Sequence, residues 1–406
     1  MLLPFDAFPL VPGGFLKQAS IIPLMIYFFV YIRDIKFLRN QLYLSIIILF
    51  YTLVFFLVTS DFSQVLKVLY VLFLFNLTLA VFLDLKNSFN IRLFFKTLFK
   101  SSILYILIAL YLIQVKYVGL SLSGLNKVLA FISDSNIDQS MGDRFYYINL
   151  EPAYAAAYLN VLYFSSFVNI DVNKKIIYLY RFVVIVLLFF TSSSYGYIIF
   201  IIVSLYQLFS KINIKTILLW LILGAAIYLI AINEFYLSVD NYTYSRVLKI
   251  LEIFQNWEDF LIITSTDQSL FLRLVNPIIG LDIARGDFFM PLGLETSYYH
   301  YPKQMLNYSQ YLPNDVSQIQ PIIDKSINTT PNNLFVKVLI EFGIVGLIIV
   351  LNYWRRMFMV FFNNNKKLLP IFMCLTLITF QIDSYVYLAV LIPFLYLFYF
   401  SKVYSS

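Results

Sequence analysis

Three charged side chains stand out because they interrupt an otherwise apolar sequence at special places. Glu151 precedes Pro152 at the start of an apolar segment, and Glu341 lies about two turns inside another. Partial desolvation at a membrane edge makes a carboxylate a stronger base, so Glu151 is the best candidate for a base or hydroxyl-orienting residue. Acids inside a membrane are costly, which makes Glu341 a functional candidate. Arg273 keeps its charge and presents a planar fork that suits an anion.

Each of these residues also has a plainer structural interpretation. Glu151 stands just before a helix that begins at Pro152, where an acid interacts favourably with the helix dipole. Arg273 could be a solvated loop residue or pair with Asp282 or Asp287. Glu341 could make an interhelical hydrogen bond. Both interpretations stay open for all three at this point.

A second group comprises candidates for binding a substrate: three arginines, two asparagines, one tyrosine and one histidine. The arginines could be surface residues, the asparagines could cap the following helix, and a tyrosine could belong to an interfacial aromatic belt. The histidine, between tyrosines and Pro302, is most simply a loop residue. The group consists of Arg144, Arg246, Arg285, Asn332, Asn333, Tyr298 and His300.

Composition excludes several classes of protein. The 406 residues are 61% hydrophobic and 13% charged, whereas an average soluble domain carries about 25% charge. A soluble multidomain enzyme is therefore excluded. Cys374 is the single cysteine and His300 the single histidine, so a disulfide within the chain is impossible, and a zinc, haem or iron–sulfur centre is not expected. We predict no metal and no cofactor.

Apolar segments long enough to cross a bilayer predict an all-α polytopic membrane protein with about eleven transmembrane helices. Residues 1–232 hold eight spans and a first outer loop at about 116–151. Residues 233–333 form one large extracytoplasmic loop, and residues 334–406 hold three spans. The predicted spans are 15–32, 41–59, 64–83, 101–119, 152–170, 176–191, 194–210, 214–232, 334–353, 368–382 and 385–401.

The basic residues predict the orientation. When eleven helices alternate, 16 of the 29 lysines and arginines fall in short connections on one side, and that side is cytoplasmic by the positive-inside rule. The N-terminus then faces out and the C-terminus faces in. The net charge of +7 is thus a topology signal, and we predict no nucleic-acid partner.

The large loop has internal order. Its acids outnumber its bases, 11 to 6, which argues against a surface for nucleic acid or anionic lipid. Helical spacing predicts one amphipathic helix within Tyr242–Phe260 and a second from Ser265 or Thr266 to Asn276-Pro277. Such a loop is typical of a lid lying on the membrane face.

Four segments carry a resemblance to one family. They are Leu3–Pro23, Arg144 through Glu151-Pro152-Ala153, the Ser-rich turn at Thr191–Ile202, and Arg273…Asn276-Pro277…Gly280 together with Asn332-Asn333…Glu341…Gly343…Gly346. The chain resembles the O-antigen and capsule polymerases of the Wzy type, relatives of the O-antigen ligases. It departs from them at Lys17-Gln18, where many have Arg-Pro, and at Asn332-Asn333, where many have His-Asn.

The resemblance implies a metal-independent glycosyltransferase of the GT-C type in the bacterial cytoplasmic (inner) membrane. It would join undecaprenyl-diphosphate-linked oligosaccharide repeat units at the outer face during lipopolysaccharide or capsular polysaccharide biosynthesis. Arg273, with Arg246 and Arg285 behind it, would stabilise charge developing on the diphosphate. Tyr298 could stack on sugar rings. A chain-length-regulating co-polymerase and a flippase are the implied partners, besides membrane lipid.

Three other functions stay open from the residues. An O-antigen ligase would transfer finished polymer to lipid A-core, but the asparagine at position 332 and the acidic outer loop count against it. A repeat-unit flippase or other transporter is expected to have short loops and charges within its spans, whereas here the polar residues concentrate in one long loop. A non-catalytic membrane scaffold is the third.

Overall fold

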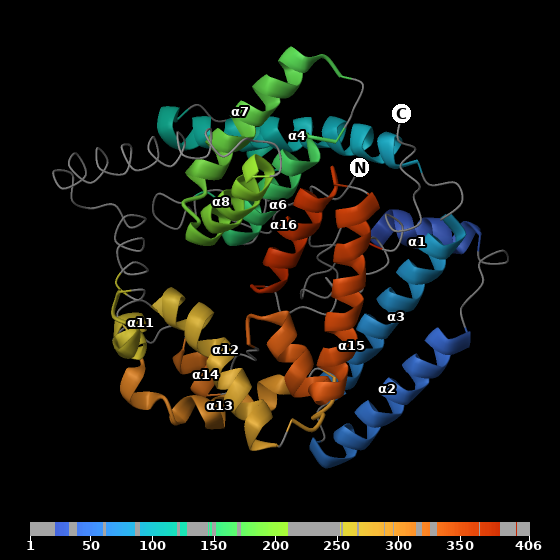
Figure 1. Ribbon diagram of the computed structural model, residues 1–406, viewed down its shortest axis with the longest axis vertical. Coiled ribbons are helices and arrows are strands. Elements are labelled where there is room, and N and C mark those ends of the chain that lie inside the picture. Colours follow the sequence, from blue (N-terminus) through green and yellow to red (C-terminus); the bar gives the residue numbers. More distant parts are fainter. Residues whose placement is uncertain are drawn as a thin grey trace. The chain divides into compact units, whose positions relative to one another are not determined.

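Long runs of Leu, Ile, Val and Phe fold as helices where the backbone must satisfy its own hydrogen bonds. In the computed structural model, every regular element formed by the described residues is a helix (Figure 1). The structure describes residues 21–31, 39–59, 62–85, 90–119, 122–127, 145, 147, 152–168, 172–209, 252, 255–265, 268–287, 289–294, 296–313, 319–324, 331–364, 366–381 and 395.

Among those residues, three helices are long and apolar enough to cross a membrane, not the eleven predicted. They are Val65–Leu85 within α3 (Phe62–Leu85), α4 (Ile91–Val118), and Leu334–Asn363 within α15 (Leu334–Asn364). The chain is therefore a helical protein with the character of a membrane protein.

Of the other predicted spans, some correspond to helices shorter than these three and some fall outside the described residues. The helices α6 (Pro152–Ser165), α7 (Lys174–Phe190) and α8 (Ser194–Phe209) have 14, 17 and 16 residues, because turns at Ser166 and Thr191 end the first two. Predicted spans 214–232 and 385–401 lie outside the described residues, apart from Leu395. The remaining helices near predicted spans are α1 (Ile21–Val30), α2 (Arg39–Thr59) and α16 (Leu369–Thr379).

The chain divides into two compact units. The first comprises residues 1–20, 92–251 and 366–375, and the second comprises residues 21–91, 252–365 and 376–406. The predicted boundaries at 232 and 333 do not coincide with this division.

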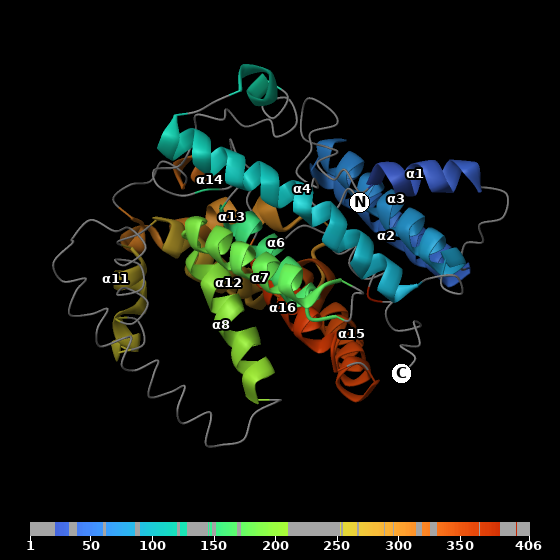
Figure 2. The same cartoon turned by 90° about the horizontal axis from the view of Figure 1, so that it is seen from above.

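In the first unit, α6 packs against both α7 and α8 (Figure 2). The Asn160 side-chain amide donates to the carbonyls of Ala156 and Gly196, each at 2.9 Å. A Cβ at Gly196 would lie 2.4 Å from the Ala156 Cβ, so only glycine permits this approach of α8 to α6. The predicted tight turn between two helices at 191–196 is confirmed, with α7 ending at Phe190 and α8 beginning at Ser194.

In the second unit, α12 (Gln268–Gly286) packs against α15 and α13 (Ser297–Leu306), which also contacts α14 (Gln320–Ile323). One stripe of α12 faces this core at helical spacing. The fully or almost fully buried residues of the core are Phe271, Val275, Ile279, Ile283, Ala284, Tyr301, Met305, Ile319, Leu339 and Ile340. Elsewhere in the unit, α1 and α2 each pack against α3.

The helix predicted to end at Asn276-Pro277 instead continues to Gly286. A proline inside a helix removes one backbone hydrogen bond. Here the buried stripe continues beyond Pro277 with Ile279 and Ile283, and this packing holds the last turns in place. Of the other predicted amphipathic helix, Tyr242–Phe260, the described part is its end: a short 3-10 turn at Trp257–Asp259 leading into α11 (Phe260–Thr264).

The helix α15 is interrupted at Gly343, whose φ of 67° and ψ of −171° are not helical. The interruption frees backbone groups on both sides. Leu292 N–H donates to the Ile340 carbonyl at 3.1 Å, Gly293 N–H to the Glu341 carbonyl at 2.9 Å, and Ile344 N–H to the Phe289 carbonyl at 3.1 Å. A segment between α12 and α13 thus fills the interruption and fixes where α13 begins.

Candidate functional site

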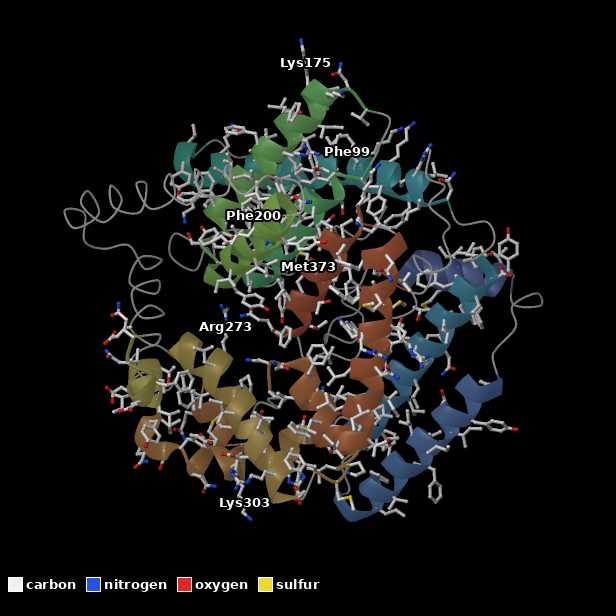
Figure 3. The ribbon with its side chains drawn as sticks, in the orientation of Figure 1. Phe99, Lys175, Phe200, Arg273, Lys303 and Met373 are labelled. Atoms are coloured by element: carbon white, nitrogen blue, oxygen red, sulfur yellow. The ribbon has the colours of Figure 1, made fainter. Side chains whose placement is uncertain are left out.

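The middle of α12 carries two of the singled-out polar residues one turn apart. Arg273 is half-buried, and its side chain leaves α12 on the side opposite to Lys303 of α13 (Figure 3). Asn276 is fully buried, and its carbonyl accepts the Tyr301 hydroxyl at 2.7 Å. Among the described residues, neither polar atom of the Asn276 side-chain amide has a hydrogen-bond partner. Buried polar groups without partners are rare and call for an explanation.

The start of α15 lies against this part of α12. Asn333 caps α15, since its side-chain oxygen accepts the N–H groups of Phe335 and Val336 at 3.1 and 3.2 Å. Of the two roles left open for Asn333, the structure shows the capping one. Asn332 takes the left-handed conformation, with φ 44°, and its amide reaches the Leu272 carbonyl at 3.5 Å. That carbonyl belongs to the residue just before Arg273.

Gly280 explains why these two segments meet. A Cβ there would lie 2.6 Å from Val336 Cγ1 and 3.1 Å from Pro331 Cβ, and 2.7 Å from the Tyr301 hydroxyl. Only glycine lets the start of α15 approach α12 so closely. The Asn276…Gly280 pattern and the Asn332-Asn333 pair, about fifty residues apart in sequence, therefore form one locality.

Glu341 lies two turns beyond Asn333 on α15 and is 1% exposed. Its Oε1 accepts the Ser297 N–H at 3.2 Å. The Ser297 hydroxyl is buried and has no hydrogen-bond partner in the part of the chain that the structure describes. Glu341 therefore connects α15 to the first residue of α13, whose Tyr301 one turn later reaches Asn276.

Lys337 was not among the residues selected from the sequence. It lies midway between Asn333 and Glu341, four residues from each, and its side chain is buried. Positions four residues apart share one face of a helix. The signal was present in the sequence, because Lys337 and Glu341 are the charged residues of the run 334–353.

The remaining described candidates lie at the edges of this locality. The Lys67 ammonium of α3 lies 5.5 Å from the centre of the Tyr298 ring, a cation–π distance. His300 is half-buried, and burial lowers its pKa more than the negative charge of Asp287 raises it. Arg285 is exposed near the end of α12, twelve residues or about 18 Å along the helix from Arg273. The structure does not bring Arg285 to Arg273.

The alternative pairing of Arg273 with Asp282 is disfavoured by the partner that Asp282 already has. The Tyr308 hydroxyl donates to the Asp282 carboxylate, and burial together with this carboxylate raises the pKa of Tyr308. Three predicted residues, Glu151, Arg144 and Arg246, lie outside the described residues. In the part of the chain that the structure describes, no three His, Cys, Asp or Glu side chains gather as a metal site would require.

The guanidinium of Arg273 and the side chains of Asn332 and Asn333 lie around the junction of α12 and α15. A series of buried polar residues, Asn276, Tyr301, Ser297 and Glu341, adjoins the same junction. A guanidinium and neutral amide donors suit an oxygen-rich anionic ligand. Among known proteins, no family model and no curated sequence matches the chain.

Proposed function

We propose that this protein is a polysaccharide polymerase that joins undecaprenyl-diphosphate-linked repeat units at the outer face of the bacterial cytoplasmic membrane. The observation that carries the proposal is the junction of α12 and α15, where the Asn332 amide reaches the Leu272 carbonyl next to Arg273 and the start of α15 packs closely on Gly280. These residues belong to two separate motifs that resemble the same family. A common locality is what a shared substrate would require.

The reaction forms one glycosidic bond and breaks one glycosyl–phosphate bond. A sugar hydroxyl of the acceptor attacks the anomeric carbon of the donor, and the diphosphate leaves with the electron pair of the broken bond. Arg273 stabilises the negative charge that develops on the leaving diphosphate. Glu151 takes the proton of the attacking hydroxyl.

Glu341 serves in this proposal as a positioning residue. Its carboxylate is almost fully buried and accepts the Ser297 N–H, so it acts through α13 on Tyr301 and Asn276. The two side chains without partners, Asn276 and Ser297, support a role for the locality in binding, because an unpaired buried polar group costs about 1–3 kcal/mol unless something compensates it.

The proposed function also sets the topology of the chain and its partners. We infer a multi-pass membrane protein with the N-terminus outside and the C-terminus in the cytoplasm from the distribution of lysine and arginine. The proposed partners are a flippase that delivers the lipid-linked units and a co-polymerase that sets chain length. No cofactor enters the proposed reaction.

Deletion of the gene, with surface polysaccharide resolved on a gel, tests this function. Loss of the modal ladder with retention of a single capped repeat unit is expected. Loss of all capping would instead indicate a ligase or a flippase and would overturn the proposal. An unchanged polysaccharide pattern would also overturn it.

A further inference from the structure

The segment Phe289–Gly293, called here the bridging segment, fills the interruption of α15 with its own backbone. Leu292 and Gly293 donate to the carbonyls of Ile340 and Glu341, and the Phe289 carbonyl accepts from Ile344. The remaining N–H groups of the segment are also satisfied. Phe289 N–H donates to the Ala284 carbonyl at 2.8 Å and Met290 N–H to the Asp287 carbonyl at 3.0 Å, while Pro291 has no N–H to satisfy.

This pairing of every backbone N–H matters because the segment is neither helix nor sheet. An irregular segment in water satisfies its backbone donors with solvent, and needs no such arrangement. Inside a bilayer each unpaired group costs several kcal/mol, so irregular backbone persists there only where protein satisfies it. The pairing in the bridging segment is the kind that membrane depth demands.

The position of charge along α15 places the bridging segment at membrane depth. Arg355 and Arg356 are exposed, and exposed arginines on a spanning helix mark a membrane boundary. Gly343 lies twelve residues before Arg355, or about 18 Å at 1.5 Å per residue. The hydrocarbon core is about 30 Å thick. The side chains of Arg355 and Arg356 can extend several ångströms along the helix to reach the interface. Even then Gly343 lies within the hydrocarbon core, in the leaflet opposite to the two arginines.

The burial of the side chains of α15 changes at Gly343. Before the interruption, residues 337–341 are buried within the protein, including Lys337 and Glu341. After it, an apolar face is open, with Ile344, Val345, Ile348 and Ile349 exposed. The two outermost side chains of the bridging segment continue this open face at the boundary: Met290 is 67% exposed and Phe289 is 40% exposed.

We propose that the bridging segment is embedded in the outer leaflet and that Phe289 and Met290 contact lipid acyl chains. The partner of this surface is the bilayer interior, because Phe289 and Met290 are apolar, adjoin the open face of α15 at Ile344 and belong to a segment whose backbone N–H groups are all paired. In the same unit the Lys67 ammonium lies 5.5 Å from the centre of the Tyr298 ring, and both are residue types of the membrane interface. The proposal does not depend on glycosyl transfer.

Spin labels at three positions test the proposal in the full-length protein reconstituted into phospholipid vesicles. The background is Cys374→Ala, which removes the buried native thiol. The test variant is Met290→Cys. Val345→Cys, 66% exposed on the open face of α15, is the lipid control, and Lys303→Cys, whose side chain points away from α13 (Figure 3), is the aqueous control.

Collision rates with oxygen, which concentrates in lipid, and with a water-soluble nickel chelate are measured at each label. The ratio of oxygen to nickel collisions at 290 is expected to match that at 345 and to exceed that at 303 several-fold. A ratio equal to that at 303 would overturn the proposal, and so would low collision rates with both reagents, which indicate a protein cover. If the 290 variant does not accumulate, Phe289→Cys provides the same comparison.

Discussion

The carboxylate of Glu341 accepts a hydrogen bond from the backbone N–H of Ser297, at 3.2 Å and 44 residues away in sequence. Ser297 is the first residue of α13, and the preceding Thr296 makes no side-chain cap. The first N–H groups of a helix lack partners within the helix, and an anion there is favoured by the helix dipole. Glu341 thus caps α13 from another helix.

Substitution of Glu341 separates its charge from its hydrogen bond. Glu341→Gln keeps an acceptor for Ser297, so it is expected to fold and to retain part of the polymer ladder. Glu341→Leu leaves the buried N–H unpaired and is expected to cost about 1–3 kcal/mol more and to abolish the ladder. Thermal unfolding in detergent and gel analysis of polysaccharide measure the two effects. A complete loss of ladder in a stably folded Glu341→Gln variant would instead assign the charge itself to catalysis.

Arg273 and Arg285 form a matched pair on one helix. Arg273→Ala is expected to lower polymerisation about 100-fold, because removing one stabiliser of transition-state charge costs about 3 kcal/mol. Arg273→Lys is expected to retain only part of the polymerisation activity, since lysine lacks the planar fork of arginine. Arg285→Ala, exposed and about 18 Å away along α12, is expected to leave the ladder unchanged. Protein levels are compared on immunoblots, and equal ladders for the two alanine variants would contradict the assignment.

The sequence was sufficient to predict the helical class, the capping role of Asn333 and the tight turn before Gly196, because each depends on neighbouring residues. The approach of Asn332 to the Leu272 carbonyl of α12 depends on long-range packing, so in the sequence only the motif resemblance linked the two segments. The continuation of α12 past Pro277 was missed, since local proline chemistry opposes it and only the buried stripe at Ile279 and Ile283 sustains it. Tertiary packing prevailed over local preference.

The interruption of α15 was not predictable from the sequence, although Gly343 is visible there. A single glycine in an apolar run is compatible with a continuous helix. What makes the difference is the bridging segment, which arrives from about fifty residues upstream and supplies partners for the freed groups. Lys337 was missed for a different reason: the sequence shows it as one of the two charged residues of the run 334–353, but only the structure shows that its side chain is buried.

Loss of the Asn333 cap is expected to destabilise the protein. Asn333→Ala should lower the free energy of unfolding by about 1 kcal/mol, whereas Asn333→Ser, which retains a cap acceptor, should lower it less. Chemical unfolding in detergent measures the difference. Asn332→Gly is the control, since glycine accepts the left-handed backbone at 332, and it is expected to be well tolerated. An equal loss for alanine and serine at 333 would argue against the cap.

The pH dependence of stability is expected to carry a contribution from His300. Burial lowers its pKa below the ordinary 6.5, so the unfolded chain binds a proton more readily than the folded one. Stability from this group is then full above about pH 6.5 and is lost as the pH falls through the folded pKa. The unfolding temperature of wild type should fall more steeply on acidification than that of His300→Gln. Parallel curves for the two proteins would contradict this.

Gly343→Ala tests the interruption of α15 directly. At φ 67° an alanine is strained, and its Cβ would lie 2.7 Å from the Phe289 carbonyl oxygen and 3.0 Å from Pro291 N. That carbonyl must then withdraw from Ile344 N–H, so we expect a loss of about 2 kcal/mol or more in unfolding free energy.

Gly286→Ala is the matched control, since a Cβ at Gly286 meets nothing within 4 Å. It is expected to unfold at the wild-type temperature or slightly above, because alanine favours the helix. Oxygen and nickel collision rates at a label on position 290 add a second readout. In the Gly343→Ala protein the label should become more accessible to nickel, because the bridging segment loses its fit to the interruption. Unfolding temperatures and nickel collision rates that are the same in both glycine variants would show that the interruption needs no glycine.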